Sequence, residues 1–283
     1  MARLLKGAEA AKALSAKLQE ETAALRGQGV APCLAIVRVG EREDDLSYER
    51  GAMKRCAAVG VDVRNVVLPG DVSQEELLDE IRALNEDDGV HGVLIFRPLP
   101  EHLDDETVRR ALRSEKDVDG ITDGSLAAVY SGAGAGWSPC TAQACVELLK
   151  HYQVPLKGKR VVVIGRSLVI GKPAAMLLLA EHATVTICHS RSEELPALCR
   201  EADILVVAVG KMGLVGKDWV RPGQTVLDVG IHVGPDGALR GDVRFDEVEP
   251  VVEAIPPVPG GVGAMTTAVL VQHVVEAAKR RAR

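Results

Sequence analysis

Strand-like apolar runs alternate with helical patterns along most of this chain, and this alternation is typical of a parallel α/β fold. In the first half the predicted strands are 34–39, 61–68 and 90–96, and the predicted helices lie near 46–59 and 73–87. In the second half, four runs rich in Val and Ile are predicted as buried strands, at 160–165, 184–189, 204–210 and 225–230. A hairpin near 233–245 and a helix over 266–280 complete the pattern.

Length and composition restrict the class of protein. With 283 residues, two domains are favoured, and the glycine-rich stretch Ser131–Gly136 is the predicted junction. The net charge is −6 and no long basic block occurs, so a nucleic-acid partner is not expected. Charges interrupt the first twenty residues too often for a signal peptide or a membrane span, which predicts a cytoplasmic protein without a membrane partner. The six cysteines form no CxxC pair, so we expect reduced thiols and no metal site.

The segment from Val161 to Pro173 is predicted to be a strand, a glycine turn and the start of a helix. Gly165 permits a tight turn, Gly171 allows close backbone approach, and Pro173 suits a first helical turn. A helix that begins in this way presents main-chain N–H groups to a phosphate, as in Rossmann-like dinucleotide sites. The alternative is a purely structural connection between strand and helix.

The next predicted strand ends at Ser190 and Arg191, and no carboxylate follows before Glu193. NAD enzymes commonly place an acidic residue near this point to bind the ribose 2′-hydroxyl. Arg191, with Arg166, could instead pair with a 2′-phosphate through charge-assisted hydrogen bonds. NADP is therefore the predicted cofactor; the alternative is that Arg191 is an ordinary surface charge.

Several motifs together resemble the bifunctional methylenetetrahydrofolate dehydrogenase/methenyltetrahydrofolate cyclohydrolases. The matching segments, in family order, are 116–120 (KDVDG), 138–141 (SPCT), 165–173 (GRSxxxGxP), 228–231 (DVGI), 241–243 (GDV) and 257–266 (PVPGGVGxMT). The resemblance implies two α/β domains. A folate-binding, catalytic domain would span 1–125 and 265–283, completed by the returning C-terminal helix, and a Rossmann-like NADP domain would span 138–264. It also implies a folate-type substrate and a homodimer.

The resemblance also implies roles for individual residues. Tyr48 would stack on the folate and Asp119 would accept N–H bonds from the pterin edge; the alternatives are a half-buried helix aromatic and a turn aspartate. The remaining substrate-binding residues would be Pro259, Gly260 and Gly261. The cofactor-binding residues would be Gly165, Arg166, Ser167, Gly171, Pro173, Ser190, Arg191 and Ile231.

The chain departs from the family at two catalytic positions. The family's lysine, four residues after the tyrosine, is Ala52 here, and its glutamine before Pro-Leu-Pro is Phe96. Four residues are about 400° of helix, so position 52 shares a face with Tyr48, whereas Lys54 points elsewhere and Arg55 lies a turn further on. The serine three residues before the tyrosine is Asp45. Ala52 and Phe96 form a compatible apolar pair; independent drift in a dead site is the alternative.

The family transfers a hydride from the methylene carbon to NADP⁺ and then hydrolyses the methenyl product. The first step needs positioning more than acid–base help, whereas a positioned base contributes about 10²–10⁴-fold to the second. We therefore predict a dehydrogenase with a weak or absent cyclohydrolase step. The alternatives are a fully bifunctional enzyme using Asp45, Lys54 or Arg55, an NADP oxidoreductase acting on another one-carbon carrier, and a non-catalytic NADP-binding protein.

Overall fold

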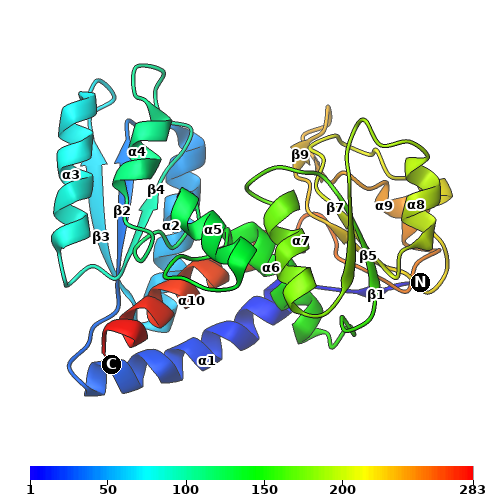
Figure 1. Ribbon diagram of the computed structural model, residues 1–283, viewed down its shortest axis with the longest axis horizontal. Coiled ribbons are helices and arrows are strands. Elements are labelled where there is room, and N and C mark those ends of the chain that lie inside the picture. Colours follow the sequence, from blue (N-terminus) through cyan, green and yellow to red (C-terminus); the bar gives the residue numbers. More distant parts are fainter. Residues whose placement is uncertain (283) are drawn as a thin grey trace. The chain divides into compact units, whose positions relative to one another are not determined.

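The computed structural model describes residues 1–282, which divide into two compact units (Figure 1). The three-stranded unit comprises residues 13–140 and the chain from Thr267 onward, and the six-stranded unit comprises residues 1–12 and 141–266. The domain bounds predicted from the sequence differ from these two units in two respects. Residues 1–12 belong to the six-stranded unit, because β1 (Arg3–Leu4) pairs with β11 (Ala254–Ile255). The boundary lies after Cys140, so the glycine-rich stretch Ser131–Gly136 falls inside the three-stranded unit.

The three-stranded unit is built on a parallel sheet of order β3-β2-β4. Its elements are β2 (Cys33–Val39), α2 (Glu43–Val59), β3 (Asp62–Leu68), α3 (Gln74–Glu86), β4 (Gly92–Ile95), α4 (Asp105–Ala111), α5 (Asp123–Ser131) and most of α1 (Gly7–Gly27) and α10 (Gly263–Arg281). The three strands lie within two residues of their predicted bounds. Side chains that alternate along β2 and β4 pack with α3 and α4 into one core.

The other face of this sheet carries α2. The capping box predicted by Ser73 and Glu76 starts α3 on the opposite side. Arg38 on β2 points toward α2, because its guanidinium donates to Glu49 on that helix. One edge of the sheet therefore brings together the carboxyl ends of β2 and β4, the beginning of α2 and the 96–100 segment.

The six-stranded unit is a wholly parallel sheet of order β1-β11-β8-β7-β5-β6. Its other elements are α6 (Cys140–His151), β5 (Arg160–Ile164), α7 (Gly171–Ala180), β6 (Thr184–Cys188), α8 (Leu195–Glu201), β7 (Ile204–Val207), η1 (Lys217–Trp219), β8 (Thr225–Asp228), β9 (His232–Val233), β10 (Leu239–Arg240) and α9 (Phe245–Val248). In Figure 1, α7 and α8 lie on opposite sides of the strands. This is the Rossmann-like arrangement that the sequence predicts.

The six-stranded unit also contains the predicted hairpin, and its edge strand differs from the prediction. Asp236-Gly237 does form the turn of an antiparallel hairpin, although each strand has only two residues. The prediction that 184–189 is a buried strand was wrong: β6 lies at the edge of the sheet, and Thr184, Thr186 and Ile187 are exposed. An edge strand is covered less completely than a central one, and its apolar residues do not reveal its place in the order.

The last helix completes the three-stranded unit. His273 on α10 is buried, its Nδ1 lies 2.9 Å from the Val118 carbonyl oxygen, and its ring stacks on Trp137 at 5.2 Å between centroids. All six cysteines are free, and five are buried, as predicted. Within residues 1–282, no helix is long and apolar enough to cross a lipid bilayer, and no cluster of three potential metal ligands occurs.

Candidate functional site

Tyr48, Phe96 and Asp119 come together at the carboxyl edge of the three-stranded sheet. The Tyr48 and Phe96 rings meet edge to face, with centroids 5.8 Å apart and planes at 84°. Burial raises the pKa of Tyr48 well above its usual 10, and the negative charge of Asp119 raises it further. That electrostatic effect requires the carboxylate and the phenol to be close neighbours. Two residues separated by 71 positions in the sequence therefore share one site.

Asp119 is held in an environment that opposes its ionisation. Burial, followed by the charge of Asp117, raises the pKa of Asp119 to about 7, while a hydrogen bond from Cys140 and the charge of Arg97 act in the opposite direction. Cys140 itself is 1% exposed, and burial raises its thiol pKa well above 9. The Asp119 carboxyl group thus titrates near neutrality and can act as an acceptor above pH 7.

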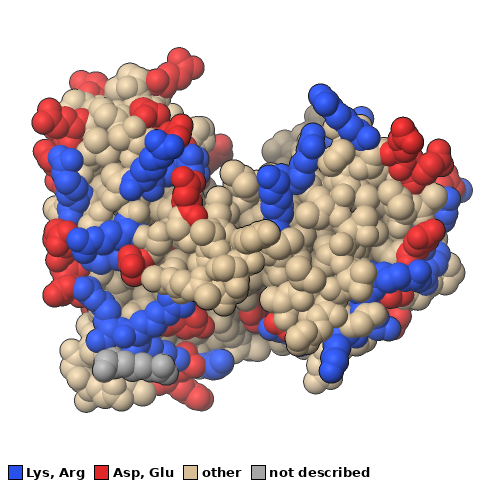
Figure 2. Space-filling view, viewed as in Figure 1, with Lys and Arg blue, Asp and Glu red and all other residues tan. Residues whose placement is uncertain are grey.

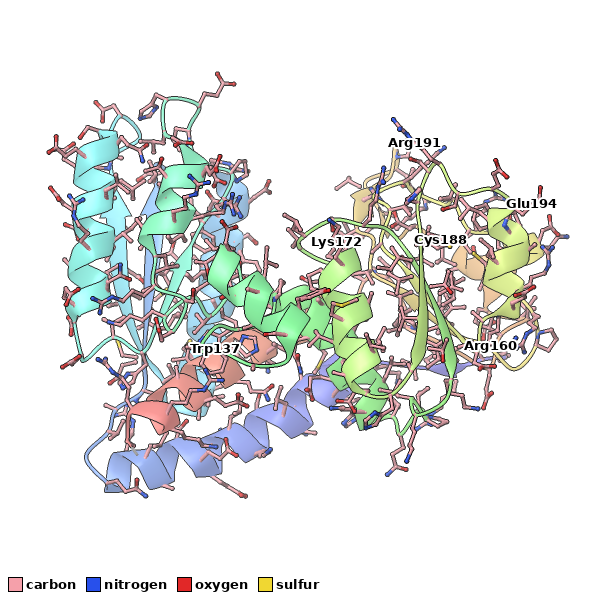
Figure 3. The ribbon with its side chains drawn as sticks, in the orientation of Figure 1. Trp137, Arg160, Lys172, Cys188, Arg191 and Glu194 are labelled. Carbon is pink, nitrogen blue, oxygen red and sulfur yellow. The ribbon has the colours of Figure 1, made fainter. Side chains whose placement is uncertain are left out.

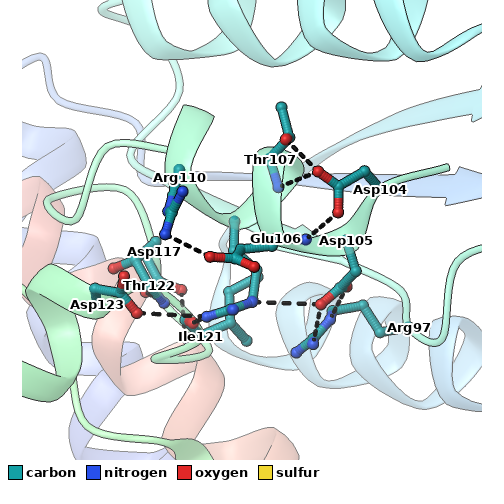
Figure 4. Close-up of polar contacts among 11 residues, drawn as sticks. Arg97, Asp104, Asp105, Glu106, Thr107, Arg110, Asp117, Ile121, Thr122 and Asp123 are labelled. Carbon is teal, nitrogen blue, oxygen red and sulfur yellow. Dashed lines mark hydrogen bonds and ion pairs between the residues drawn. The ribbon is translucent and has the colours of Figure 1, made fainter.

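Arg97 belongs to an ion-pair network beside this site (Figure 4). Its guanidinium binds both carboxylate oxygens of Asp105, at 2.5 and 2.6 Å, and Arg109 approaches the same carboxylate at 3.3 Å. Arg109 also pairs with Asp123 at 3.5 Å. Bidentate pairing fixes Arg97 in orientation, so the positive charge that acts on Asp119 comes from an ordered group.

The two substituted family positions lie in the same region. Ala52 is fully buried on α2, on the face that also carries Asp45 and Glu49. Phe96 is 8% exposed and follows β4, where its N–H donates to the Val37 carbonyl. Neither side chain can donate or accept a proton.

A buried ion pair near this apolar pair was missed at the sequence level. Arg38 Nε donates to Glu49 Oε2 at 2.9 Å, and each residue is only 7% exposed. Arg38 sits in the apolar run of β2, and its partner lies eleven positions away. Only the interruption of that run by a charged residue could have signalled an internal partner.

The glycine turn that is predicted to bind phosphate lies at the carboxyl end of β5. A Cβ atom on Gly165, which has a φ of +132°, would clash with the Ala208 carbonyl, and one on Gly171 would clash with the Gly165 carbonyl. Ser167 Oγ accepts the Ile170 N–H at 3.1 Å and closes the turn. Both glycines are therefore required by backbone contacts, as predicted, while Pro173 is buried in the first turn of α7.

The exposed residues of this turn fit a dinucleotide phosphate. Arg166 and Ser167 are exposed just before α7, whose N-terminal residue Ile170 provides no side-chain cap. Ser190 and Arg191 are exposed beyond Cys188 at the same end of β6 (Figure 3), where Lys and Arg side chains gather in Figure 2. Among residues 1–282, neither Arg166 nor Arg191 has an acidic partner within ion-pair distance, so both guanidinium groups are available to an anion.

The remaining predicted residues lie in the loops of the six-stranded unit. Ile231, 56% exposed, follows β8 and neighbours Gly263. Pro259 and Gly260 are exposed, but Gly261 is buried, with its carbonyl against Gly7. The structure therefore gives Gly261 a packing role, and contact with a substrate stays a prediction for this loop.

Comparisons with known proteins agree with this geometry. Residues 5–119 match the catalytic domain of tetrahydrofolate dehydrogenase/cyclohydrolase, and residues 139–282 match its NAD(P)-binding domain, which confirms the predicted fold and cofactor class. The "Bifunctional protein FolD" of Carboxydothermus hydrogenoformans is 51% identical over 98% of this chain and 97% of its own length. That of Clostridioides difficile is 48% identical over 98% and 96%.

Solved structures give the same result. The bifunctional FolD enzyme of Campylobacter jejuni superimposes with a TM-score of 0.95 at 37% identity, over 99% of this chain and 100% of that one. The Trypanosoma brucei enzyme, described as complexed with NADP and an inhibitor, gives 0.91 at 37% identity, over 100% and 99%. This chain belongs to the tetrahydrofolate dehydrogenase/cyclohydrolase family.

Proposed function

We propose that this protein oxidises 5,10-methylenetetrahydrofolate to 5,10-methenyltetrahydrofolate with NADP⁺. The observation that carries the proposal is the meeting of Tyr48 and Asp119 at one sheet edge, as the family resemblance implies for a folate site. The exposed residues 166–169 of the glycine turn, and an Arg191 that has no acidic partner among residues 1–282, support NADP, which accepts a hydride when bound.

The chain's own residues would bind and orient the folate. Tyr48 offers a flat ring for stacking, and its raised pKa keeps the hydroxyl protonated. Asp119 would accept N–H bonds from the pterin edge through its ionised carboxylate, which predominates above pH 7. Phe96 supports the Tyr48 ring from the side and lines the site with apolar surface.

The second step, hydrolysis of the methenyl group, requires proton transfer as well as positioning. The loss of the lysine and the glutamine favours a weak or absent step, but the relatives are named as bifunctional, which favours the alternative with a substitute residue. Lys54 is exposed and Arg55 donates to Ser15, so these two side chains face elsewhere. Asp45 is 6% exposed, on the α2 face of Ala52 and one turn before Tyr48.

We therefore propose that hydrolysis proceeds and depends on Asp45. Arg42 Nε lies 4.0 Å from Asp45 Oδ2, which is too far for a hydrogen bond, so the carboxylate can accept a proton from water. In this role Asp45 would take a proton from the attacking water. The homodimer and the cytoplasmic location stay predictions from the sequence and the resemblance.

Two absorbance assays test the proposal. NADPH formation with methylenetetrahydrofolate measures the first step, and decay of added methenyltetrahydrofolate measures the second. Asp45→Asn should slow the second step by about 10²-fold while leaving the first, and Asp44→Asn, at an exposed neighbouring acid, should change neither. Absence of NADPH formation would contradict the dehydrogenase assignment, and hydrolysis unaffected by Asp45→Asn would remove Asp45 from the second step.

A further inference from the structure

The buried ion pair of Arg38 and Glu49 links three parts of the three-stranded unit. Arg38 Nε donates to Glu49 Oε2 at 2.9 Å, and Arg38 Nη1 donates to the Gly40 carbonyl. The guanidinium thereby joins the end of β2, the connection that follows it and the second turn of α2.

Stability alone is a poor reason for this arrangement. Removing two charges from water is costly, and a pair of well-packed apolar side chains commonly holds a core as well as a buried ion pair does. An ion pair differs from an apolar pair in being directional, because its hydrogen bonds are satisfied only at one position of the helix against the sheet. Buried charge pairs are best attested as devices that fix register.

At its beginning α2 is held by contacts of Arg42, which donates to the Pro98 carbonyl at 2.8 Å and lies 4.0 Å from Asp45. The helix starts after Arg42, whose side chain makes no capping hydrogen bond. Glu49 directly follows Tyr48. Arg38 directly follows Val37, whose carbonyl accepts the N–H of Phe96. The ion pair is thus one residue away from Tyr48 and one residue away from the strand position that is hydrogen-bonded to Phe96.

We propose that Arg38 and Glu49 are positioning residues that hold the Tyr48 ring for stacking on the flat heteroaromatic ring of a reduced folate. This inference rests on the proposed function. The ion pair fixes the position of α2 along the strand direction of the sheet. That position determines where the Tyr48 ring lies relative to Phe96. Neither Arg38 nor Glu49 needs to touch the substrate.

The test replaces both charges together. Arg38→Met with Glu49→Leu removes the pair without leaving one charge buried alone, so the melting temperature should stay within a few degrees of the wild type. Calorimetric binding of 5-formyltetrahydrofolate, an unreactive probe, should weaken about 10-fold or more, and the KM for methylenetetrahydrofolate should rise more than kcat falls. NADP affinity should not change. A matched control, Arg110→Gln with Glu106→Gln, removes an exposed pair and should alter none of these quantities.

A second measurement needs no substrate. The chain has only two Phe and three Tyr, so the ring-to-ring NMR contact between Tyr48 and Phe96 can be assigned, and it should be lost in the double variant. Arg38→Lys, which keeps the charge but not the two-point link, should fold and show a smaller loss of both contact and probe affinity. A preserved ring contact, or unchanged probe affinity, in a folded double variant would overturn the positioning role. If the wild type shows the ring contact but binds no folate probe, the proposed function fails, while loss of that contact in the variant still supports the positioning.

Discussion

Replacing Asp119 by Asn should stabilise the unliganded protein in a pH-dependent way. The pKa of Asp119 is raised from 3.8 to about 7, so the native state binds this proton more tightly than the unfolded state does. Stability therefore falls as pH rises from about 4 to 7, and above pH 7 the full cost of the ionised carboxylate is present. An Asn residue never bears that cost.

The magnitude follows from the shift. About three pKa units at about 1.4 kcal/mol each set an upper limit of about 4 kcal/mol. Because Asp119 is only half-buried, solvent screening reduces this to about 1–2 kcal/mol. For a chain of this size, that corresponds to a rise in melting temperature of roughly 2–8 °C at pH 8.

Scanning calorimetry of wild type and Asp119→Asn at pH 8 and pH 4.5, without ligands, measures the effect. The variant should be more stable at pH 8 and nearly equal to the wild type at pH 4.5, and Asp71→Asn, at an exposed loop position, should show no such dependence. The same Asp119 variant should bind folate more weakly and NADP normally. A stability change of equal size and sign at both pH values would refute the claim that burial opposes ionisation at this site.

Three further predictions concern both units. Arg191→Ala should raise the KM for NADP about 10–100-fold and that for NAD far less, because a charge-assisted bond to the 2′-phosphate is lost. Gly171→Ala should abolish NADP binding measured by calorimetry, since its Cβ would clash with the Gly165 carbonyl. Ala52→Lys with Phe96→Gln should speed methenyltetrahydrofolate decay by up to about 10²-fold, and Ala52→Lys alone should do less because Phe96 offers the lysine no hydrogen-bond acceptor.

Each of these three predictions has an outcome that would contradict it. Equal effects of Arg191→Ala on NADP and NAD would mean that the arginine does not read the 2′-phosphate. Normal cofactor affinity in Gly171→Ala would show that the turn can open without loss of the site. A double variant at positions 52 and 96 that folds but hydrolyses no faster would indicate that the second step does not depend on these two positions.

Local sequence patterns predicted most of the fold but only part of the site. The central strands and the turn at Gly165–Gly171 were predicted because their apolar runs and glycines are local signals. The strands β1 and β11 have two residues each, too few for any periodicity to reveal. The exposed β6 shares the composition of its buried neighbours, and only the strand order distinguishes it.

The site contained interactions that no local pattern could reveal. The Arg38–Glu49 pair joins a strand to a helix. An arginine in an apolar run does not indicate which residue it pairs with. The raised pKa of Asp119 arises from burial and from the charge of Asp117, while Cys140 and Arg97 oppose the rise, and tertiary structure brings all of these groups together. The glycines around Pro259 illustrate the same limit, because Gly261 turns inward to pack against Gly7.

The division of the chain has a consequence for its synthesis. Neither unit is a continuous stretch, and the three-stranded unit is completed only when α10 is synthesised, after the whole of the six-stranded unit. The 126 residues from Thr141 to Thr266 take about 6–25 s to translate at about 5–20 residues per second. During that interval the nascent unit lacks His273, so the Trp137 ring lacks its stacking partner and the Val118 carbonyl lacks its contact with the imidazole. The six-stranded unit, which begins with residues 1–12, is therefore complete before the three-stranded unit, whose core stays open until α10 has been made.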